Sequence, residues 1–153
     1  MSVPDPLGDL IGDWAGVSRL WMSPDHEAQE SATEADVDIA ADGRFFVLRY
    51  AWTQDDREQD GMLLLGFQKD GTGEAVWVDS WHMDDRMMHC KGEIRPDGTA
   101  AVTGSYAAPP GPDWGWRLEI QPDGSEGFTL MMFNIDPEGQ ESRAVEAIYA
   151  RVD

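Results

Sequence analysis

The segment Asp79–Cys90, DSWHMDDRMMHC, gathers side chains that bind metals and transfer protons. It carries two histidines, three aspartates and Cys90, the only cysteine of the chain. Imidazole, carboxylate and thiolate groups are the usual ligands of zinc, and they also serve as general bases and nucleophiles. Which of these chemistries is available depends on the side chains that share one face.

We interpret the segment as two antiparallel strands that meet at a turn around Asp84 and Asp85. This register places Trp81 opposite Met88 and aligns Asp79 with Cys90, and alternation puts these four side chains on one face. That face is the more apolar one. The pattern therefore predicts an inner wall of tryptophan, methionine, cysteine and one carboxylate.

In the same register, His82 and His89 lie on the outer face as diagonal neighbours, roughly 7–8 Å apart. Two imidazoles at that spacing can share a zinc ion if a third ligand joins them. Cys90 points to the other face, however. We therefore expect surface histidines and no metal site.

The following hairpin has a three-residue PDG turn, and it tests which face is inside. Its register pairs Gly92 with Val102 and Ile94 with Ala100, and it brings Tyr106 to Met88. Both hairpins assign the same face to the interior. In 113–121 the apolar face is Trp114, Trp116, Leu118 and Ile120. In 127–135 both faces are apolar, so either one can be inside.

Short turns recur through the chain at 41–44, 69–73, 95–99, 121–125 and 136–140. Each holds a glycine with aspartate or proline beside it, which is typical of tight hairpins. No stretch shows a long helical period. The pattern predicts an all-β fold: one antiparallel β-barrel domain, residues 1–153, with a short helical turn at 5–12. The ten expected strands are 13–21, 27–40, 44–53, 60–69, 74–82, 86–95, 99–107, 113–121, 126–135 and 141–152.

Composition narrows the classes of partner. The formal net charge is -19, which repels phosphate backbones and anionic headgroups, so we expect neither nucleic acid nor a membrane as partner. A single cysteine excludes an internal disulfide framework. No apolar run approaches the ~20 residues that span a bilayer, and the N-terminus lacks a signal-peptide pattern. We expect a cytoplasmic protein, with a homodimer left open.

Seven tryptophans and eight methionines in a small β protein indicate an apolar cavity with large, adaptable walls. We expect the ligand to be a small hydrophobic or amphipathic molecule, with no cofactor. The candidate ligand-binding residues are Tyr50, Trp52, Trp77, Asp79, Trp81, Met88, Cys90, Tyr106 and Trp116.

Asp79 is the most informative of these residues, because an inward carboxylate costs several kcal/mol unless it is paired or hydrogen-bonded. One interpretation is structural, with Tyr106, Arg49 or a buried water as its partner. The other makes Asp79 the polar anchor of a ligand. It can also act as a general base if burial raises its pKa, but no catalytic residue is assigned.

Gly12, Asp13 and Trp14 form a G-x-W at the start of the first strand, and Arg151 ends the last strand. This pair resembles the calycin superfamily, which comprises the lipocalins and their relatives. The resemblance implies that Arg151 stacks on Trp14 and closes one end of the barrel.

The chain more closely resembles a bacterial family of lipocalin-like domains of unknown function. The matching segments are LIGDW at 10–14, WVDS at 77–80 and YAR at 149–151. GFQ at 66–68 departs from the family's pattern, because Gln68 replaces an acid. This resemblance implies a fold and a pocket but no established reaction.

Nitrobindins, which bind haem, resemble the chain in GDWAG and VEAIYAR. Their haem ligand is a histidine just before the last of these segments, where this chain has Ser142, Arg143 and Ala144. The three histidines here, His26, His82 and His89, lie elsewhere, so haem binding of that kind is disfavoured.

Three classes of function stay open. A ligand-binding barrel predicts a sizeable dry cavity with one or two polar groups. An enzyme requires a second titratable group close to Asp79 or Cys90. A structural or interaction module predicts a filled barrel and an exposed apolar stripe at Met131, Phe133 and Ile135.

Overall fold

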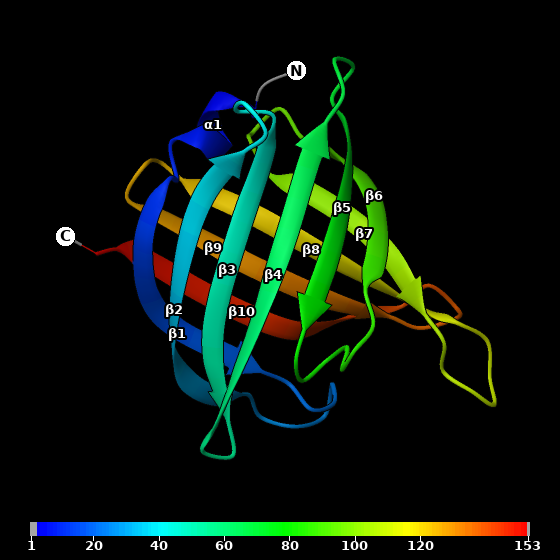
Figure 1. Cartoon of the computed structure of the whole chain (residues 1–153). Coiled ribbons are helices and arrows are strands. Elements are labelled where there is room, and N and C mark those ends of the chain that lie inside the picture. Colours follow the sequence, from blue (N-terminus) through cyan, green and yellow to red (C-terminus); the bar gives the residue numbers. More distant parts are fainter. Residues whose placement is uncertain (1–2, 153) are drawn as a thin grey trace.

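Alternating apolar and polar residues between short turns produce ten antiparallel strands in the computed structural model, which describes residues 3–152. Each strand pairs with its neighbours in the chain, and β1 also pairs with β10, so the sheet closes into a barrel (Figure 1). The strands are β1 (Gly12–Leu20), β2 (Gln29–Ala40), β3 (Phe45–Gln54), β4 (Arg57–Phe67), β5 (Thr72–Asp79), β6 (Met88–Ile94), β7 (Ala100–Tyr106), β8 (Trp114–Asp123), β9 (Gly127–Ile135) and β10 (Glu141–Arg151). The expected all-β barrel is confirmed.

The two ends of the barrel are built differently. At one end, which we call the helix end, tight turns join the strands. Gly71 and Gly98 adopt φ of 87° and 89° there, a conformation that favours glycine. At the other end, the loop end, the connections 21–28, 80–87 and 107–113 are longer. Long connections above a rigid barrel are the usual place for a binding site.

Helix α1 (Asp5–Gly8) covers the helix end (Figure 1). It is shorter than the expected helical turn at 5–12, since Pro4 and Pro6 bracket its start and the chain leaves it after Gly8. Leu7 and Leu10 are fully buried and seal this end of the core. Within residues 3–152, no helix has the length and apolarity needed to cross a bilayer.

Trp14 and Arg151 lock α1 to the barrel. The Trp14 indole donates a hydrogen bond to the Leu10 carbonyl at 2.8 Å, and the Arg151 guanidinium stacks 4.4 Å from the indole centroid. Arg151 also donates to the carbonyl oxygens of Asp9 and Ile11, each at 2.8 Å, and to that of Ser125 at 2.6 Å. The expected stacking of these two side chains is present, and it closes the helix end.

The faces predicted for β6, β7 and β8 are confirmed. Gly92 pairs with Val102 and Ile94 with Ala100, and Trp116, Leu118 and Ile120 are buried. In β9 the inner face belongs to Phe128, Leu130 and Met132.

The register predicted for β5 and β6 is wrong by four residues. Met88 lies opposite Trp77, and Cys90 lies opposite Ala75. β5 ends at Asp79, so residues 80–87 form a loop and not two strand ends. A shift by an even number preserves the faces within the strands, but residues of the loop follow no strand alternation.

We expect Arg151→Lys to lower the free energy of unfolding by about 1–3 kcal/mol, because lysine cannot reproduce a planar fork that bonds several carbonyls while it stacks on an indole. Urea unfolding followed by tryptophan fluorescence measures the change. The matched control is Arg44→Lys, whose exposed side chain only faces Asp42 and should stay within about 0.5 kcal/mol. Equal effects of the two substitutions would contradict the locking role.

Candidate functional site

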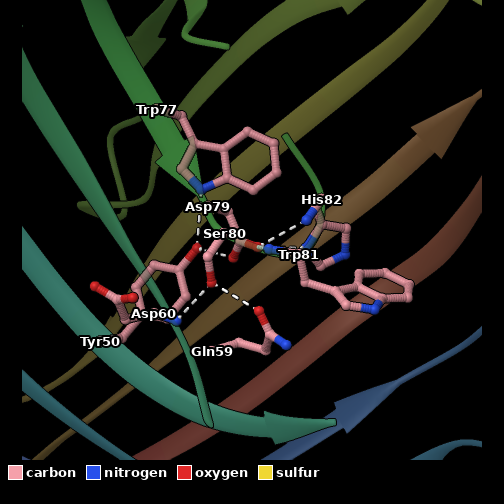
Figure 2. Close-up of polar contacts among 8 residues, drawn as sticks. All are labelled: Tyr50, Gln59, Asp60, Trp77, Asp79, Ser80, Trp81 and His82. Carbon is pink, nitrogen blue, oxygen red and sulfur yellow. Dashed lines mark hydrogen bonds and ion pairs between the residues drawn. The ribbon is translucent and has the colours of Figure 1, made fainter. Parts of the chain in front are cut away.

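Asp79, the last residue of β5, lies inside the barrel with its side chain fully buried. Its Oδ1 accepts hydrogen bonds from the backbone N–H groups of Trp81 and His82, each at 2.9 Å, and faces the His82 Nδ1 at 3.1 Å. Its Oδ2 accepts a hydrogen bond from the Tyr50 hydroxyl at 2.7 Å. Figure 2 shows these groups converging on the one carboxylate.

Because Gly61 of β4 has no side chain, the Tyr50 hydroxyl can reach across this strand to Asp79. Tyr50 pairs with Gly61, and Gly61 pairs with Asp79, so the three residues form a row across three strands. A Cβ at Gly61 would overlap the Tyr50 hydroxyl. The Trp77 indole N–H also donates to that hydroxyl, at 2.9 Å. Tyr50 thus links an inner tryptophan to the buried acid.

The ionised form of Asp79 is the stable one. Burial raises the pKa of its carboxyl, but the hydrogen bond from the His82 side chain, the charge of His82, its backbone N–H and the Tyr50 hydroxyl lower it, and the net pKa is below the ordinary value. Burying an ion costs several kcal/mol, and four hydrogen bonds to a charged acceptor, at about 1.5–3 kcal/mol each, offset that cost.

Tyr50 stays protonated and is the donor in its bond to Asp79. Burial first, and then the charge of Asp79, raise the pKa of the Tyr50 hydroxyl well above its usual range. Because an ionised carboxylate accepts hydrogen bonds only, His82 must likewise carry its proton on Nδ1. A neutral His82 then presents Nε2 as an acceptor.

His82 was predicted on the outer face beside His89, and this prediction is wrong. The Asp79 carboxylate caps the turn that follows β5, and this turn carries the His82 ring into the barrel, where its side chain is 10% exposed. His89 stays on the outer face of β6 and is exposed. The two imidazoles therefore diverge, and residues 3–152 contain no group of three metal-binding side chains.

Four tryptophan rings surround the His82 imidazole. The ring centroids of Trp81, Trp116, Trp77 and Trp52 lie 4.6, 5.3, 5.7 and 5.8 Å from it. Trp77 and Trp116 stack on each other with 11° between their planes. We call these four rings the tryptophan box. Its walls come from β3, β5 and β8, and Trp81 belongs to the 80–87 loop.

One polar atom of the box lacks a partner. The Trp116 indole N–H is buried and, among the side chains of residues 3–152, it alone is a buried polar atom without a hydrogen bond. Buried polar groups normally have a partner. An acceptor supplied from outside the chain would satisfy this one.

A small cavity lies beside the box in the loop-end half of the barrel. Its free volume is about 10 Å³, about the room that one water molecule needs. Among residues 3–152, the barrel interior therefore does not contain the expected sizeable cavity. The polar lining consists of Ser18, Thr33, Tyr50, Asp79, His82 and Tyr149. The apolar lining consists of Leu20, Trp52, Leu130, Met132, Val145 and Ala147.

Five of the nine predicted ligand-binding residues come together around the acid. These are Tyr50, Trp52, Trp77, Asp79 and Trp116. Trp81 joins the box from the loop and is only half-buried.

The other three predicted residues lie along β6 and β7. Met88 and Cys90 pack over Gly104, and Tyr106 donates a hydrogen bond to Asn134 at 2.6 Å. Burial raises the pKa of the Cys90 thiol to about 11, so it is neutral and unreactive near neutral pH.

The sequence interpretation missed His82, Thr33 and Tyr149. The hydroxyls of Thr33 and Tyr149 lie 2.9 Å apart inside the barrel. The local sequence pattern around each residue is that of an ordinary strand, so it marks neither as part of a site. For His82 a signal exists, because an aspartate that ends a strand often caps the backbone two residues on. Two of the proposed partners of Asp79 were also wrong, since Tyr106 bonds to Asn134 and Arg49 pairs outside with Asp36.

Comparisons with known proteins give a family and a fold. The family described as "Protein of unknown function (DUF1579)" matches residues 5–151. The crystal structure of Rv2717c from M. tuberculosis superposes with a TM-score of 0.66 at 14% sequence identity, over 99% of this chain and 100% of that one. This likeness shows a shared fold only. None of the curated proteins matches the chain.

Gly61→Ala should separate Tyr50 from Asp79, since the new methyl group occupies the position of the hydroxyl. We expect the free energy of unfolding to fall by about 2–4 kcal/mol, because the substitution overpacks the core and breaks a buried bond to a charge. Urea unfolding measures this loss. Gly8→Ala is the control, as no heavy atom lies within 4 Å of its added Cβ. If Gly61→Ala unfolded with the same free energy as the wild type, position 61 would tolerate a side chain, and the required gap between Tyr50 and Asp79 would be contradicted.

Asp79→Asn should lower the free energy of unfolding at pH 7 by about 2–4 kcal/mol, because the amide presents donors to Tyr50 and His82. The pKa of Asp79 is lower in the folded protein, so its ionisation stabilises the fold fully above the unfolded value of about 4. This contribution is lost as pH falls through the folded pKa. Urea unfolding at pH 7 and pH 3 should therefore show a gap between wild type and Asp79→Asn that narrows on acidification. A constant gap would mean that the pKa of Asp79 is the same in the folded and unfolded chains, and a gap that widens on acidification would mean that Asp79 is neutral in the fold.

Proposed function

We propose that this chain, which belongs to the DUF1579 family of proteins of unknown function, binds a small hydrophobic or amphipathic molecule in the loop-end half of its barrel. One observation carries the proposal: hydrogen-bonding groups of Asp79, His82 and Tyr50 converge on a cavity whose other walls are mostly apolar. A few placed polar groups in an apolar concavity are the usual make-up of a ligand site.

The ligand gains its space by displacing the 80–87 loop. The cavity of about 10 Å³ holds no more than a water, and His82 and Trp81 fill the volume above it. The loop has no strand partner: it is held by the Asp79 cap, by hydrogen bonds of Ser80 with Asp60 and Gln59, and by the packing of its inward side chains. Such a segment opens at lower free-energy cost than a paired strand.

The adjoining barrel wall is also loosely joined. The register pairs of β6 and β7 run only from Lys91 and Thr103 to Ile94 and Ala100. Toward the loop end, Met88 and Cys90 meet Gly104 through side chains. β6 begins directly after the 80–87 loop, so this weakly paired stretch supports displacement of the loop.

The filled-barrel alternative agrees with the small volume of the cavity but receives less support from the outer surface. It requires an exposed stripe at Met131, Phe133 and Ile135, but Met131 is 7% exposed and the Arg117 guanidinium covers Phe133, 4.3 Å from its ring centroid. An outer face covered in this way offers little free apolar surface to a partner. A homodimer through β9 is accordingly not part of the proposal.

Proton-transfer catalysis is the second candidate. An enzyme requires a titratable group within hydrogen-bond reach of Asp79, and the His82 Nδ1 lies 3.1 Å away. A carboxylate that fixes the tautomer of a histidine leaves Nε2 as a general base. Asp79 would then position His82, and the base would be His82 and not Asp79 as the sequence suggested.

We also propose that the protein is related to the calycins and acts in the bacterial cytoplasm. The stacking of Arg151 on Trp14 at the helix end supports the calycin relation. The acidic charge of -19 supports a soluble setting without nucleic-acid or membrane partners.

Native mass spectrometry of the full-length protein as purified tests the proposed function. We expect a non-covalent mass on the wild type that is absent from the denatured protein. Ser18→Leu, which fills the cavity from β1 at a cost of about 1–3 kcal/mol, should lose that mass. The control Val17→Leu, at an outward position that is 46% exposed, should keep it. An apo mass for the wild type, or a mass retained by Ser18→Leu, would contradict binding in this cavity.

A further inference from the structure

The tryptophan box holds a ring where a ligand would be expected. His82 reaches the centre of the box from a loop, whereas Trp52, Trp77 and Trp116 stand on β3, β5 and β8. The three strand-borne tryptophans therefore form the rigid wall of the site. The His82 ring that fills it is carried by the 80–87 loop, which is the more mobile part. Removing the His82 ring leaves a cage between the tryptophan rings, beside the Asp79 carboxylate.

The walls of this cage attract positive charge. Aromatic faces carry negative potential and bind cations within about 6 Å of their centroids, and the centroids of the three strand-borne rings, Trp52, Trp77 and Trp116, lie within 5.8 Å of the imidazole. The Asp79 carboxylate, 3.1 Å from the His82 Nδ1, supplies a full negative charge at the edge of the cage. Low-dielectric surroundings strengthen its attraction for a cation.

The net charge of the rest of the molecule also favours a positively charged ligand. A net charge of -19 raises the local concentration of cations and repels anions. Asp84 and Asp85 belong to the 80–87 loop and Asp60 bonds to it, and all three are exposed at the same end of the barrel. An anionic ligand such as a carboxylate would have to approach through this field and then bind beside an ionised acid.

We infer that the tryptophan box is a binding site for a small organic cation, an ammonium ion with alkyl substituents, and that His82 occupies this site in the ligand-free protein. This inference rests on the proposed function and names its ligand class. The unpartnered Trp116 N–H lies in the wall of the box, so a cation that also carries an oxygen acceptor fits best. The ligand exchanges with His82, and the Asp79 carboxylate pairs with whichever of the two is in the box.

Choline and its neutral isostere, in which a quaternary carbon replaces the nitrogen, separate charge recognition from apolar burial. Binding to the full chain is followed by tryptophan fluorescence and by saturation transfer from the protein to the choline methyl protons. We expect choline to bind His82→Ala at least about tenfold more tightly than it binds wild type, because the competing ring is gone. His89→Ala, an exposed histidine on β6, is the matched control and should resemble wild type.

Charge selectivity decides the ligand class. We expect choline to bind His82→Ala at least about tenfold more tightly than the isostere does, since cation–π attraction is strong in a desolvated site. Far-UV circular dichroism checks that His82→Ala is folded, and His82→Gln replaces it if the fold is lost. Equal binding of choline and the isostere would overturn the cation class and leave an apolar site, with the proposed function intact.

Failure of choline to bind the folded variant, or equal affinity for the variant and wild type, would also overturn the inference. The proposed function is tested separately by native mass spectrometry, and it fails if the purified wild type shows only its apo mass. A neutral or anionic molecule found in that experiment would support the proposed function and contradict the cation class.

Discussion

An ionised carboxylate inside a β-barrel is the constraint around which the loop-end half of this protein is organised. Asp79 cannot stay charged without donors, and four are supplied, from Tyr50, the backbone of Trp81 and both donors of His82. Each donor requires a further feature. Tyr50 needs the gap at Gly61, and the His82 and Trp81 donors need a turn directly after β5. The position of the 80–87 loop is thus a consequence of satisfying one buried charge.

The helix end of the barrel contributes stability, and the loop end provides access to the cavity. At the helix end, α1, the buried Leu7 and Leu10, and the stacking of Arg151 on Trp14 form a closed apolar plug. At the loop end the closure consists of a loop whose aromatic and imidazole side chains fold inward, and the β6–β7 pairing stops short of it. Thr33 and Tyr149, hydrogen-bonded to each other, line the cavity, and Tyr149 stacks on Phe128, which packs against Trp14 of the plug.

The fold was predictable because its signals are local and repeat. Period-two alternation gave the inner faces of β6 to β8, and glycine turns located the hairpins. The inward position of Asp79 followed from the same alternation. The site was only partly predictable, since His82 lies beyond the end of β5, where an aspartate cap replaces strand geometry and reverses the face. The role of Gly61 depends on contacts between β3, β4 and β5, which no local pattern contains. The volume of the cavity depends on how all the inner side chains pack, and the sequence predicted a larger one.

The protonation of the His82 ring tests the central account most directly, because an ionised Asp79 requires a proton on Nδ1. Nitrogen-15 chemical shifts of the imidazole, read through long-range couplings to its ring protons in the folded protein at pH 7, distinguish the two nitrogens. The account predicts a protonated Nδ1, in either the neutral Nδ1–H tautomer or the imidazolium. A neutral ring with its proton on Nε2 alone would contradict it. Asp79 would then have to be the donor, and the charged acid at the centre of the site would not exist.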